Sequence, residues 1–231
     1  MTKPVCVWIT TQMPHPWKVI LILAELKLPF EIMVFRTEDT EEPPFSTLNP
    51  NGSIPAIEDP NTGIVLWESG AIITYIIEQY DKDLRLTYAE DRLQDRHALN
   101  QWLHFQMSEQ GPFLSLAGWL NHCHPEKLPS IQVLINDECM RQLRVLNSVL
   151  ENKDWLVGEK MTYADLALVP WNDVLHQYIP MTIEERFAEF PNVKAWHERM
   201  ISLPSWKRLV GIREKTMKEI NELDLLPTEN E

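Results

Sequence analysis

The chain has 231 residues, of which 44% are hydrophobic, enough for one large or two modest cores. Its net charge of −13 is spread without a Lys/Arg cluster, which argues against nucleic acid and anionic membranes as partners. The three cysteines form no C-x-x-C pair, the apolar start is too short for a signal peptide, and no apolar run reaches ~18 residues, so we expect a reduced, cytoplasmic protein.

The first 80 residues alternate strand-like and helix-like patterns, which is typical of a small α/β unit. The run VCVWI predicts a buried strand, and FEIMVF, reached through a crossover helix, predicts a second strand parallel to it. The turn DPNTG predicts an antiparallel hairpin. In chain order we expect a strand at 5–9, a helix at 16–26, a strand at 30–35, a Pro-rich acidic segment at 37–53, strands at 54–58 and 64–67, and a helix at 69–80.

From about residue 91 to 218 the sequence contains no convincing strand pattern. The expected helices are 91–110, continuing past Gly111-Pro112 with a kink, then 131–151, 163–178, 183–189 and 192–202. The domains that we predict are an α/β domain at 1–82, a linker at 83–90, an all-helical domain at 91–220 and an acidic flexible tail at 221–231.

The segment TTQMPHPWKV (10–19) sets a histidine between two prolines directly after the first strand. Pro16 suits the first position of a helix, where its missing N–H is no loss. A residue before proline is disfavoured in the α region, so we expect His15 to take the extended conformation of an N-cap. His15 would then stand at the positive end of the helix, either as a cap or as a chemical group.

Two further segments are suited to a peptide-like ligand. In NPNGSIPAIED, a cis Ile54–Pro55 bond would turn the N–H and C=O of Ile54 outward to pair with an extended ligand, whereas a trans bond would be an ordinary strand start. In WESG, Ser69 begins a helix whose free N–H groups bind a carboxylate, unless it serves only as a cap. Glu68 beside it can hold an ammonium. The pair fits the α-amino-acid end of a ligand.

Two other patterns carry no chemistry in our interpretation. The segment KMTYADLALVPW places Asp165 three residues after Thr162, which predicts a capping box with a structural role. The segment HCH (122–124) does not have the spacing of a zinc site, so we expect no metal.

The order of elements, together with NPNGSIPAI, WESGAI and TYADLA, resembles a cytosolic glutathione transferase. The likeness covers about residues 4–210 and is closest to the fungal branch that includes the nitrogen-catabolite regulator. The resemblance implies a thioredoxin-like N-terminal domain, an all-α C-terminal domain, a homodimer and glutathione as the cofactor.

The resemblance also implies the glutathione contacts. Ile54 would pair with the cysteinyl backbone, and Glu68 and Ser69 would hold the γ-glutamyl end. The remaining residues implied at this site are Ser53 and Pro55 beside Ile54, and Thr40 and Glu41 toward the glycine carboxylate.

The residue that stabilises the thiolate is where the chain departs from the family. Transferases generally present a Tyr, Ser or Cys at the end of the first strand. Here the first tyrosine is Tyr75, the first serine is Ser46, and Cys6 lies inside the strand, where a small core residue is expected. His15 stands where the regulator-like branch often has Asn, and Pro16 where it has Gly.

We therefore expect a group in residues 10–17 to meet the sulfur. His15 could donate to the sulfur or act as a base. Thr10 and Thr11 are the hydroxyl alternatives, and the N–H of Trp17 is a further donor. The alternatives for His15 are a contact with the second substrate or a cap without chemistry.

A second, hydrophobic substrate would meet the helical domain. The residues that we assign to it are Trp17, Gln106, Gln110, Trp119 and Trp171. Gln106 and Gln110 are polar in an apolar setting, although aromatic residues at helical spacing usually form core.

The expected function is a glutathione-dependent transferase that acts on a small hydrophobic electrophile, in biosynthesis or detoxification. One alternative is glutathione-dependent cis–trans isomerisation of an activated olefin by addition, rotation and elimination. The other is a non-catalytic ligand carrier or regulator. The given sequence begins four residues before the first strand, without the Asn-rich extension of the regulator, so we expect an enzyme.

Overall fold

The computed structural model of the chain describes residues 2–10 and 13–224. It divides into two compact units, of which the first contains the residues up to Lys82 together with those from Leu203 onward, and the second contains Asp83–Ser202. The C-terminal helix thus belongs with the α/β unit, whereas the sequence pattern places it in a helical domain at 91–220.

The first unit is built on a four-stranded sheet with the order β2-β1-β3-β4. The strands are β1 (Val5–Ile9), β2 (Phe30–Val34), β3 (Ala56–Asp59) and β4 (Ile64–Trp67). β1 and β2 are parallel, while β3 is antiparallel to β1 and to β4, as the crossover and hairpin patterns predict. The β1 run VCVWI buries alternate residues completely, so it lies at the centre of the core.

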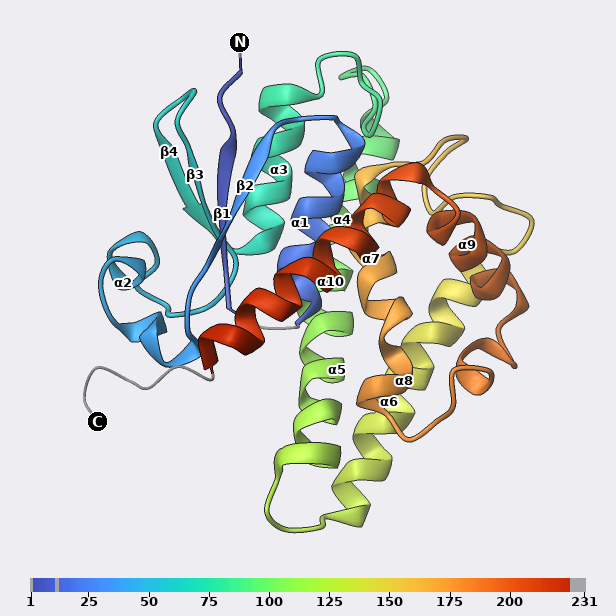
Figure 1. The fold of residues 1–231 in the computed structure, drawn as a ribbon. Helices are drawn as coiled ribbons and strands as arrows, with labels where there is room; N and C mark the ends of the chain where they lie inside the picture. Colours follow the sequence, from blue (N-terminus) through green and yellow to red (C-terminus); the bar gives the residue numbers. More distant parts are fainter. Residues whose placement is uncertain (1, 11–12, 225–231) are drawn as a thin grey trace. The chain divides into compact units, whose positions relative to one another are not determined.

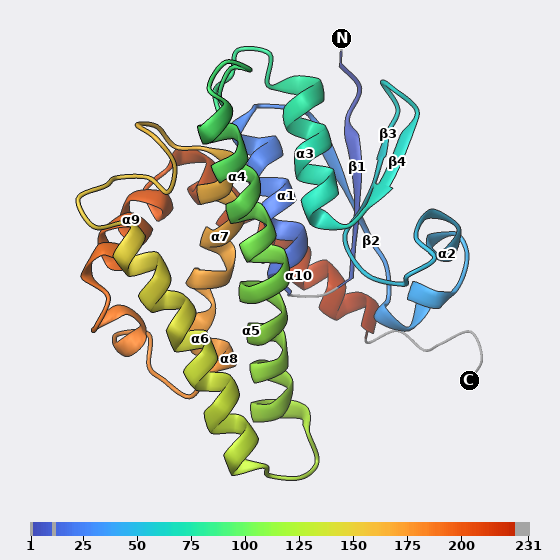
Figure 2. The same ribbon diagram turned by 180° about the vertical axis from the view of Figure 1, so that it is seen from behind.

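The helices of this unit pack against elements that lie far from them in the sequence. α1 (Pro14–Glu25) contacts β1, α3 (Ser69–Tyr80) and α10 (Pro204–Asp224), and the two opposite views show α10 lying across α1 (Figures 1 and 2). Residues 19–23 of α1 are 0% exposed because neighbours cover the helix on several sides. The short segments η1 (Thr37–Glu41) and α2 (Phe45–Leu48) occupy the Pro-rich stretch between β2 and β3.

α10 corrects the expected C-terminal boundary. The sequence pattern ends the helical region at 220 and predicts a flexible tail from 221, but the helix continues to Asp224, and residues 225–231 lie outside the described part. Trp206, Leu209 and Ile220 are buried, at 5%, 1% and 5% exposed. Burial of these side chains stabilises the helix. Its many charged residues make the helix hard to recognise from the sequence alone.

The start of α1 corrects the expected conformation of His15. The N-cap is Met13, with φ −59° and ψ 145°, and His15 is the second residue of the helix. Met13 precedes Pro14 and takes the extended backbone that a proline imposes on its predecessor. Pro16 then falls within the first turn, where a missing N–H also breaks no helical hydrogen bond.

The hairpin of β3 and β4 is tied to α3 by a buried carboxylate. Asp59 is 1% exposed and accepts hydrogen bonds from the Tyr75 hydroxyl at 2.6 Å, from the Tyr80 hydroxyl, and from the N and Nδ2 of Asn61, both at 2.8 Å. Burial alone would raise the pKa of Asp59, but these hydrogen bonds outweigh it and hold the pKa below its ordinary value.

The second unit consists of helices joined by loops, and its described residues form no strand. Its elements are α4 (Leu93–Phe105), the π-helical η2 (Gln106–Gln110), α5 (Gly111–Gly118), the π-helical η3 (Trp119–Cys123), α6 (Pro129–Val149), α7 (Tyr163–Asp173), α8 (Leu175–Tyr178), the 3₁₀ turn η4 (Glu185–Phe187) and α9 (Pro191–Ile201). The expected helix 163–178 is interrupted at Val174, and the expected helix 183–189 is only the turn η4.

The segment from α4 to η3 runs on as one rod beside α6, without a break at Gly111-Pro112 (Figure 2). The π-helical η2 ends two residues before Pro112, and its wider turn helps to accommodate a residue that lacks an N–H. None of the helices in the described ranges combines the length and apolarity needed to cross a membrane.

The predicted capping box at the start of α7 is present. Asp165 is 0% exposed, and its carboxylate accepts from the backbone N of Thr162 at 2.9 Å, from Leu156 N at 3.0 Å and from Trp196 Nε1 at 2.9 Å. The single carboxylate therefore joins α7, the preceding loop and α9.

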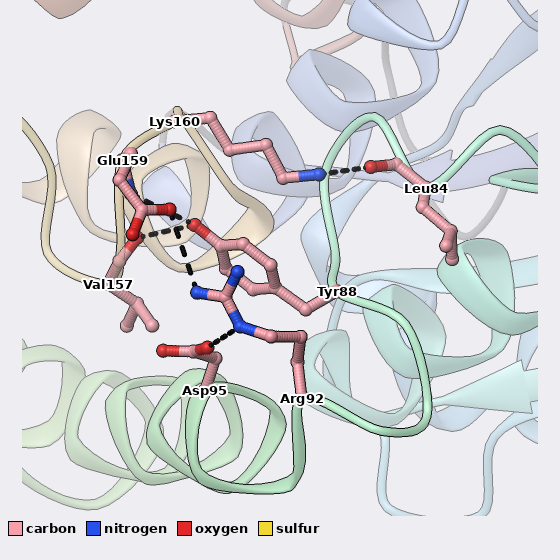
Figure 3. Close-up of polar contacts among 7 residues, drawn as sticks. All are labelled: Leu84, Tyr88, Arg92, Asp95, Val157, Glu159 and Lys160. Carbon is pink, nitrogen blue, oxygen red and sulfur yellow. Dashed lines mark hydrogen bonds and ion pairs between the residues drawn. The ribbon is translucent and has the colours of Figure 1, made fainter.

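Tyr88 joins the beginning of the second unit to the loop before α7 (Figure 3). Its hydroxyl donates to Val157 O at 3.1 Å and accepts from Glu159 N at 3.2 Å. The cationic groups of Arg92 and Lys160 each lie 4.8 Å from the centre of its ring. These contacts hold the loop before α7 to the residues that lead into α4.

Candidate functional site

The junction of β4 and α3 has the geometry of an anion and ammonium site. Glu68 joins the two elements at φ 67° and ψ 108°, in a region that L-residues rarely adopt. This conformation costs on the order of 1–3 kcal/mol and is characteristic of functional sites. Ser69, at 3% exposed, begins α3, while the Glu68 side chain is exposed. Glu68 therefore directly precedes the N-terminus of α3, the end of a helix that favours negative charge.

The segment before β3 lies in the same unit. The Ile54–Pro55 bond is cis, one of the two forms that the sequence leaves open, and Ser53 and Ile54 are half-buried. Two asparagines hold Ser53: Asn49 Nδ2 donates to its carbonyl at 2.5 Å, and Asn51 Nδ2 donates to its hydroxyl at 2.9 Å. The NPNG motif predicts a turn, but its pattern does not show that these two amides hold Ser53, one of the residues predicted to face the ligand.

The predicted glycine-carboxylate residues lie beside this turn. Thr40 is half-buried and donates its hydroxyl to Thr37 O at 2.9 Å, while Glu41 is exposed. A Cβ at Gly52 would lie 3.6 Å from Thr40 O and 3.9 Å from Glu41 Cγ. The structure therefore brings η1 next to the residues that precede Ile54.

The thiolate candidates lie at the end of β1 and the start of α1. Thr10 is 2% exposed, Trp17 is 1% exposed, and Thr11 lies outside the described residues. Burial, with a contribution from the charge of Lys18, lowers the pKa of His15 to about 4. His15 is therefore neutral at physiological pH and can offer a hydrogen bond but no positive charge. Burial raises the pKa of Cys6, as do Glu31 and Glu58, so its thiol is not activated.

Lys18 is the residue that sequence reasoning missed. Its side chain is 0% exposed, which is rare for lysine. Burial lowers the pKa of Lys18 to about 7, and the negative charge of Glu68 acts in the opposite direction. The sequence signal is that this lysine directly precedes the apolar run VILIL. If neighbouring elements cover that helix on all sides, the lysine has no solvent-exposed position to occupy.

The second-substrate candidates, apart from Trp17, belong to the helical unit. Gln106 and Trp171 are 0% exposed and Gln110 is 2% exposed, and they gather around Gly111, whose added Cβ would lie 3.2 Å from Gln106 Nε2 and 3.5 Å from Trp171 Cζ2. Trp119, at 49% exposed, stacks edge-on against His124 instead.

A hydrogen bond from Gln110 Nε2 to Asn172 Oδ1, 3.1 Å long, joins the rod to α7. Asn172 is 1% exposed and was not among the predicted residues. The cluster is a polar centre within an apolar interior, and its role toward a substrate stays a prediction.

The chain is similar to known proteins over most of its length. Residues 12–79 match the glutathione S-transferase N-terminal domain, and residues 114–204 match the glutathione S-transferase C-terminal domain. Glutathione S-transferase-like protein gedE from Aspergillus terreus is 38% identical over 86% of this chain and 91% of its own length. Protein URE2 from Debaryomyces hansenii is 31% identical over 83% of this chain and 73% of its own length.

A solved structure shows the same fold. The glutathione transferase URE2P8 from Phanerochaete chrysosporium, crystallised with oxidized glutathione, has a TM-score of 0.87 and 36% identity, covering 94% of this chain and 98% of its own. The match extends over both units and confirms the resemblance that the sequence motifs indicate. The chain belongs to the glutathione S-transferase family.

Proposed function

We propose that the protein binds glutathione and transfers it to a small hydrophobic electrophile. The observation that carries this proposal is the β4–α3 junction, where Glu68, with its strained backbone, directly precedes buried Ser69 at the N-terminus of a helix. A γ-glutamyl group offers the matching ammonium and carboxylate. The structural relative that was crystallised with oxidized glutathione supports the choice of ligand.

The proposed ligand lies along the first unit. Ile54 pairs with the cysteinyl backbone, the turn held by Asn49 positions Ser53, and Thr40 and Glu41 face the glycine end. This order leaves the cysteinyl sulfur toward the start of α1. Transfer then requires the bound thiol to lose its proton, because the thiolate is the nucleophile.

Titration calorimetry with glutathione tests binding directly. We expect a single-site isotherm for the wild type and at least tenfold weaker binding for Glu68→Gln, because the variant loses a charge-assisted hydrogen bond to the ammonium. Glu78→Gln, at an exposed position of the same helix, is the matched control. Equal affinities for all three proteins would contradict the proposed site.

Mass spectrometry of the products separates the possible reactions. Incubation with glutathione and a panel of electrophiles is expected to give products heavier by one glutathione. A product of unchanged mass from an activated olefin would instead support isomerisation, which is worth testing because His15 stands where the related branch often has Asn. If glutathione binds but no compound changes, the alternative of a non-catalytic carrier or regulator would be favoured instead.

We also propose that the protein acts as a homodimer in a reducing compartment. The dimer rests on the family, and light scattering during size-exclusion chromatography measures it. The compartment is supported by three free cysteines, of which Cys123 is exposed.

A further inference from the structure

Three titratable side chains of the helical unit form a cluster that the proposed function does not use. Asp173 is the last residue of α7, Arg186 lies in η4 and His197 lies in α9, so the cluster joins three elements. Arg186 is 8% exposed, which is low for an arginine, and His197 is 1% exposed. The proposed glutathione contacts belong to the first unit, whereas these residues belong to the second.

Arg186 makes the contacts that hold η4 in place. Its Nη1 donates to the backbone carbonyl of Asp173 and lies 3.6 Å from the Asp173 carboxylate. Its Nη2 lies 3.4 Å from His197 Nε2, and its guanidinium carbon lies 4.6 Å from the centre of the Phe187 ring. The Phe187 ring in turn lies 5.0 Å from the His197 ring. One side chain thus ties η4 to both α7 and α9.

The contact between Arg186 and His197 determines where the histidine carries its proton. A guanidinium offers only N–H donors, so the ring nitrogen that faces it has to be the acceptor. His197 Nε2 therefore carries no proton, and the proton of the neutral ring lies on Nδ1, which is buried and has no hydrogen-bond partner among the described residues. Burial, with a contribution from the charge of Arg186, lowers the pKa of His197 and so favours this neutral form.

A proton on Nε2 would reverse this contact. Two cationic donors would then face each other 3.4 Å apart in an interior that water screens poorly. The Asp173 carboxylate lies 3.6 Å from His197 Nε2 and 3.6 Å from Arg186 Nη1, so it can pair with either cation. Glu198, on the same helix, also favours a protonated His197, while Asn147, which contacts the start of α9 from α6, is uncharged.

We propose that His197 is a pH-sensitive latch, which holds the segment 182–190 through Arg186 when its ring is neutral and releases the segment when its ring is protonated. A proton from solvent binds to Nε2, and the charged ring takes the Asp173 carboxylate as its partner. Arg186 then leaves the cluster, and η4 loses its ties to α7 and α9. This latch goes beyond the proposed function and does not depend on glutathione.

Nitrogen-15 NMR of the histidine-labelled protein tests the protonation state, because the two neutral tautomers of an imidazole give different shifts. We expect the proton of His197 on Nδ1 at about pH 7.5. Arg186→Met should raise the pKa of His197, because it removes a positive charge beside the ring. Arg96→Met, at an exposed position of α4, is the matched control and should leave that pKa unchanged. His197→Gln assigns the signal.

Hydrogen exchange measures the release of residues 182–190. From about pH 7.5 to about pH 5, after correction for the chemical exchange rate, local opening in the wild type should rise about threefold or more, because a released histidine binds a proton more readily than the buried one. Repeating the measurement in dilute urea separates local opening from global unfolding. His197→Asn, whose amide accepts from Arg186 but does not titrate, should lose this rise, and His97→Asn, at an exposed position of α4, should keep it.

The capping carboxylate of this segment does not imitate the latch. Glu185 accepts from Thr182 N at 2.8 Å, and this hydrogen bond lowers the pKa of Glu185 below its ordinary value. Its charge is therefore still present at about pH 5, so the cap stays in place over the range in which His197 titrates.

Each measurement can overturn the latch. A proton on His197 Nε2 at neutral pH would contradict the donor role of Arg186. An equal rise in opening in the wild type and His197→Asn would show that another group titrates. If His197→Asn does not fold, the NMR titration decides, because a His197 pKa that Arg186→Met leaves unchanged would show that the two residues are not coupled.

Discussion

His15 and Lys18 lie one turn apart on α1, and burial has shifted both toward their neutral forms. The pKa of His15 is lowered to about 4, and that of Lys18 to about 7. The lowered pKa of His15 also makes the stability of the protein depend on pH. The unfolded histidine, with a pKa of ~6.5, binds a proton more readily than the folded one. Protonation therefore favours unfolding as the pH falls from about 7 toward 4.

The first prediction concerns this pH dependence. Between about pH 7 and pH 5 the wild type should lose roughly 1–2 kcal/mol of stability through His15. His15→Asn should lose correspondingly less, because the amide does not titrate. Urea unfolding at both pH values and one protein concentration measures the difference. His97→Asn, at an exposed position of α4, should follow the wild type, and an equal pH dependence in His15→Asn would contradict the burial of His15.

A second residue-scale prediction compares two capping pairs of the same type. Asp165→Ala leaves Trp196 Nε1 and Leu156 N without their acceptor in a buried setting and should cost about 3 kcal/mol. Glu185 caps Thr182 N at 2.8 Å on an exposed turn, so Glu185→Ala should cost under ~1 kcal/mol. Urea midpoints measure both. Similar costs would show that the buried contacts of Asp165 add nothing to the cap.

At the scale of elements, Asp59 ties the hairpin to α3. Asp59→Asn should destabilise the protein by roughly 2–3 kcal/mol at neutral pH, because an amide cannot accept all of the hydrogen bonds that the carboxylate accepts. The folded pKa of Asp59 is lowered, so its contribution is present above the unfolded value of ~3.9 and is lost as the pH falls through the folded pKa.

Unfolding of Asp59→Asn at neutral and acidic pH checks both statements. The gap between wild type and variant should narrow below about pH 4, where the wild-type carboxylate becomes protonated. A gap that stays constant with pH would mean that the charge of Asp59 does not contribute.

The strands and most helices were predictable because each has a local signature. VCVWI and FEIMVF are short apolar runs, DPNTG is a turn, and the capping pair Thr162 and Asp165 marks the start of α7 by spacing alone. The first turn of α1 was not predictable, since two prolines offer two possible starts and the chain uses the earlier one.

The candidate site was predictable only where its residues lie next to each other in the sequence. Glu68 and Ser69 form such a pair, and the cis form of Ile54–Pro55 was one of two alternatives. Lys18 depends on burial, which the VILIL run does not reveal for the preceding residue. Its relation to Glu68 depends on the packing of α1 with α3, which the spacing along the chain does not show.

At the scale of the whole molecule, the first unit uses both ends of the chain. α10 contacts α1 and β2, and a local pattern cannot show that a helix beginning at Pro204 packs with the first helix. The prediction assigned α10 to the helical domain at 91–220 because it follows those helices in the chain. The structure instead groups the residues from Leu203 onward with those up to Lys82.

The whole-molecule prediction follows from this arrangement. A fragment of residues 1–82 leaves the α10-facing side of α1 uncovered and should not fold alone. The same fragment joined to residues 203–224 by a flexible linker should regain near-ultraviolet circular dichroism and glutathione binding. A folded, glutathione-binding fragment 1–82 would show that α10 is dispensable.

The contact between α10 and α1 also has a consequence for synthesis. A ribosome makes β1 and α1 first and α10 last, at about 5–20 residues per second. The nascent α/β half therefore waits on the order of ten seconds for the helix that completes it, while the whole of Asp83–Ser202 emerges in between. The helical unit can finish first, although it is encoded second. During that interval the side of α1 that α10 covers would be exposed, and we expect it to be the part of the nascent unit that a chaperone binds.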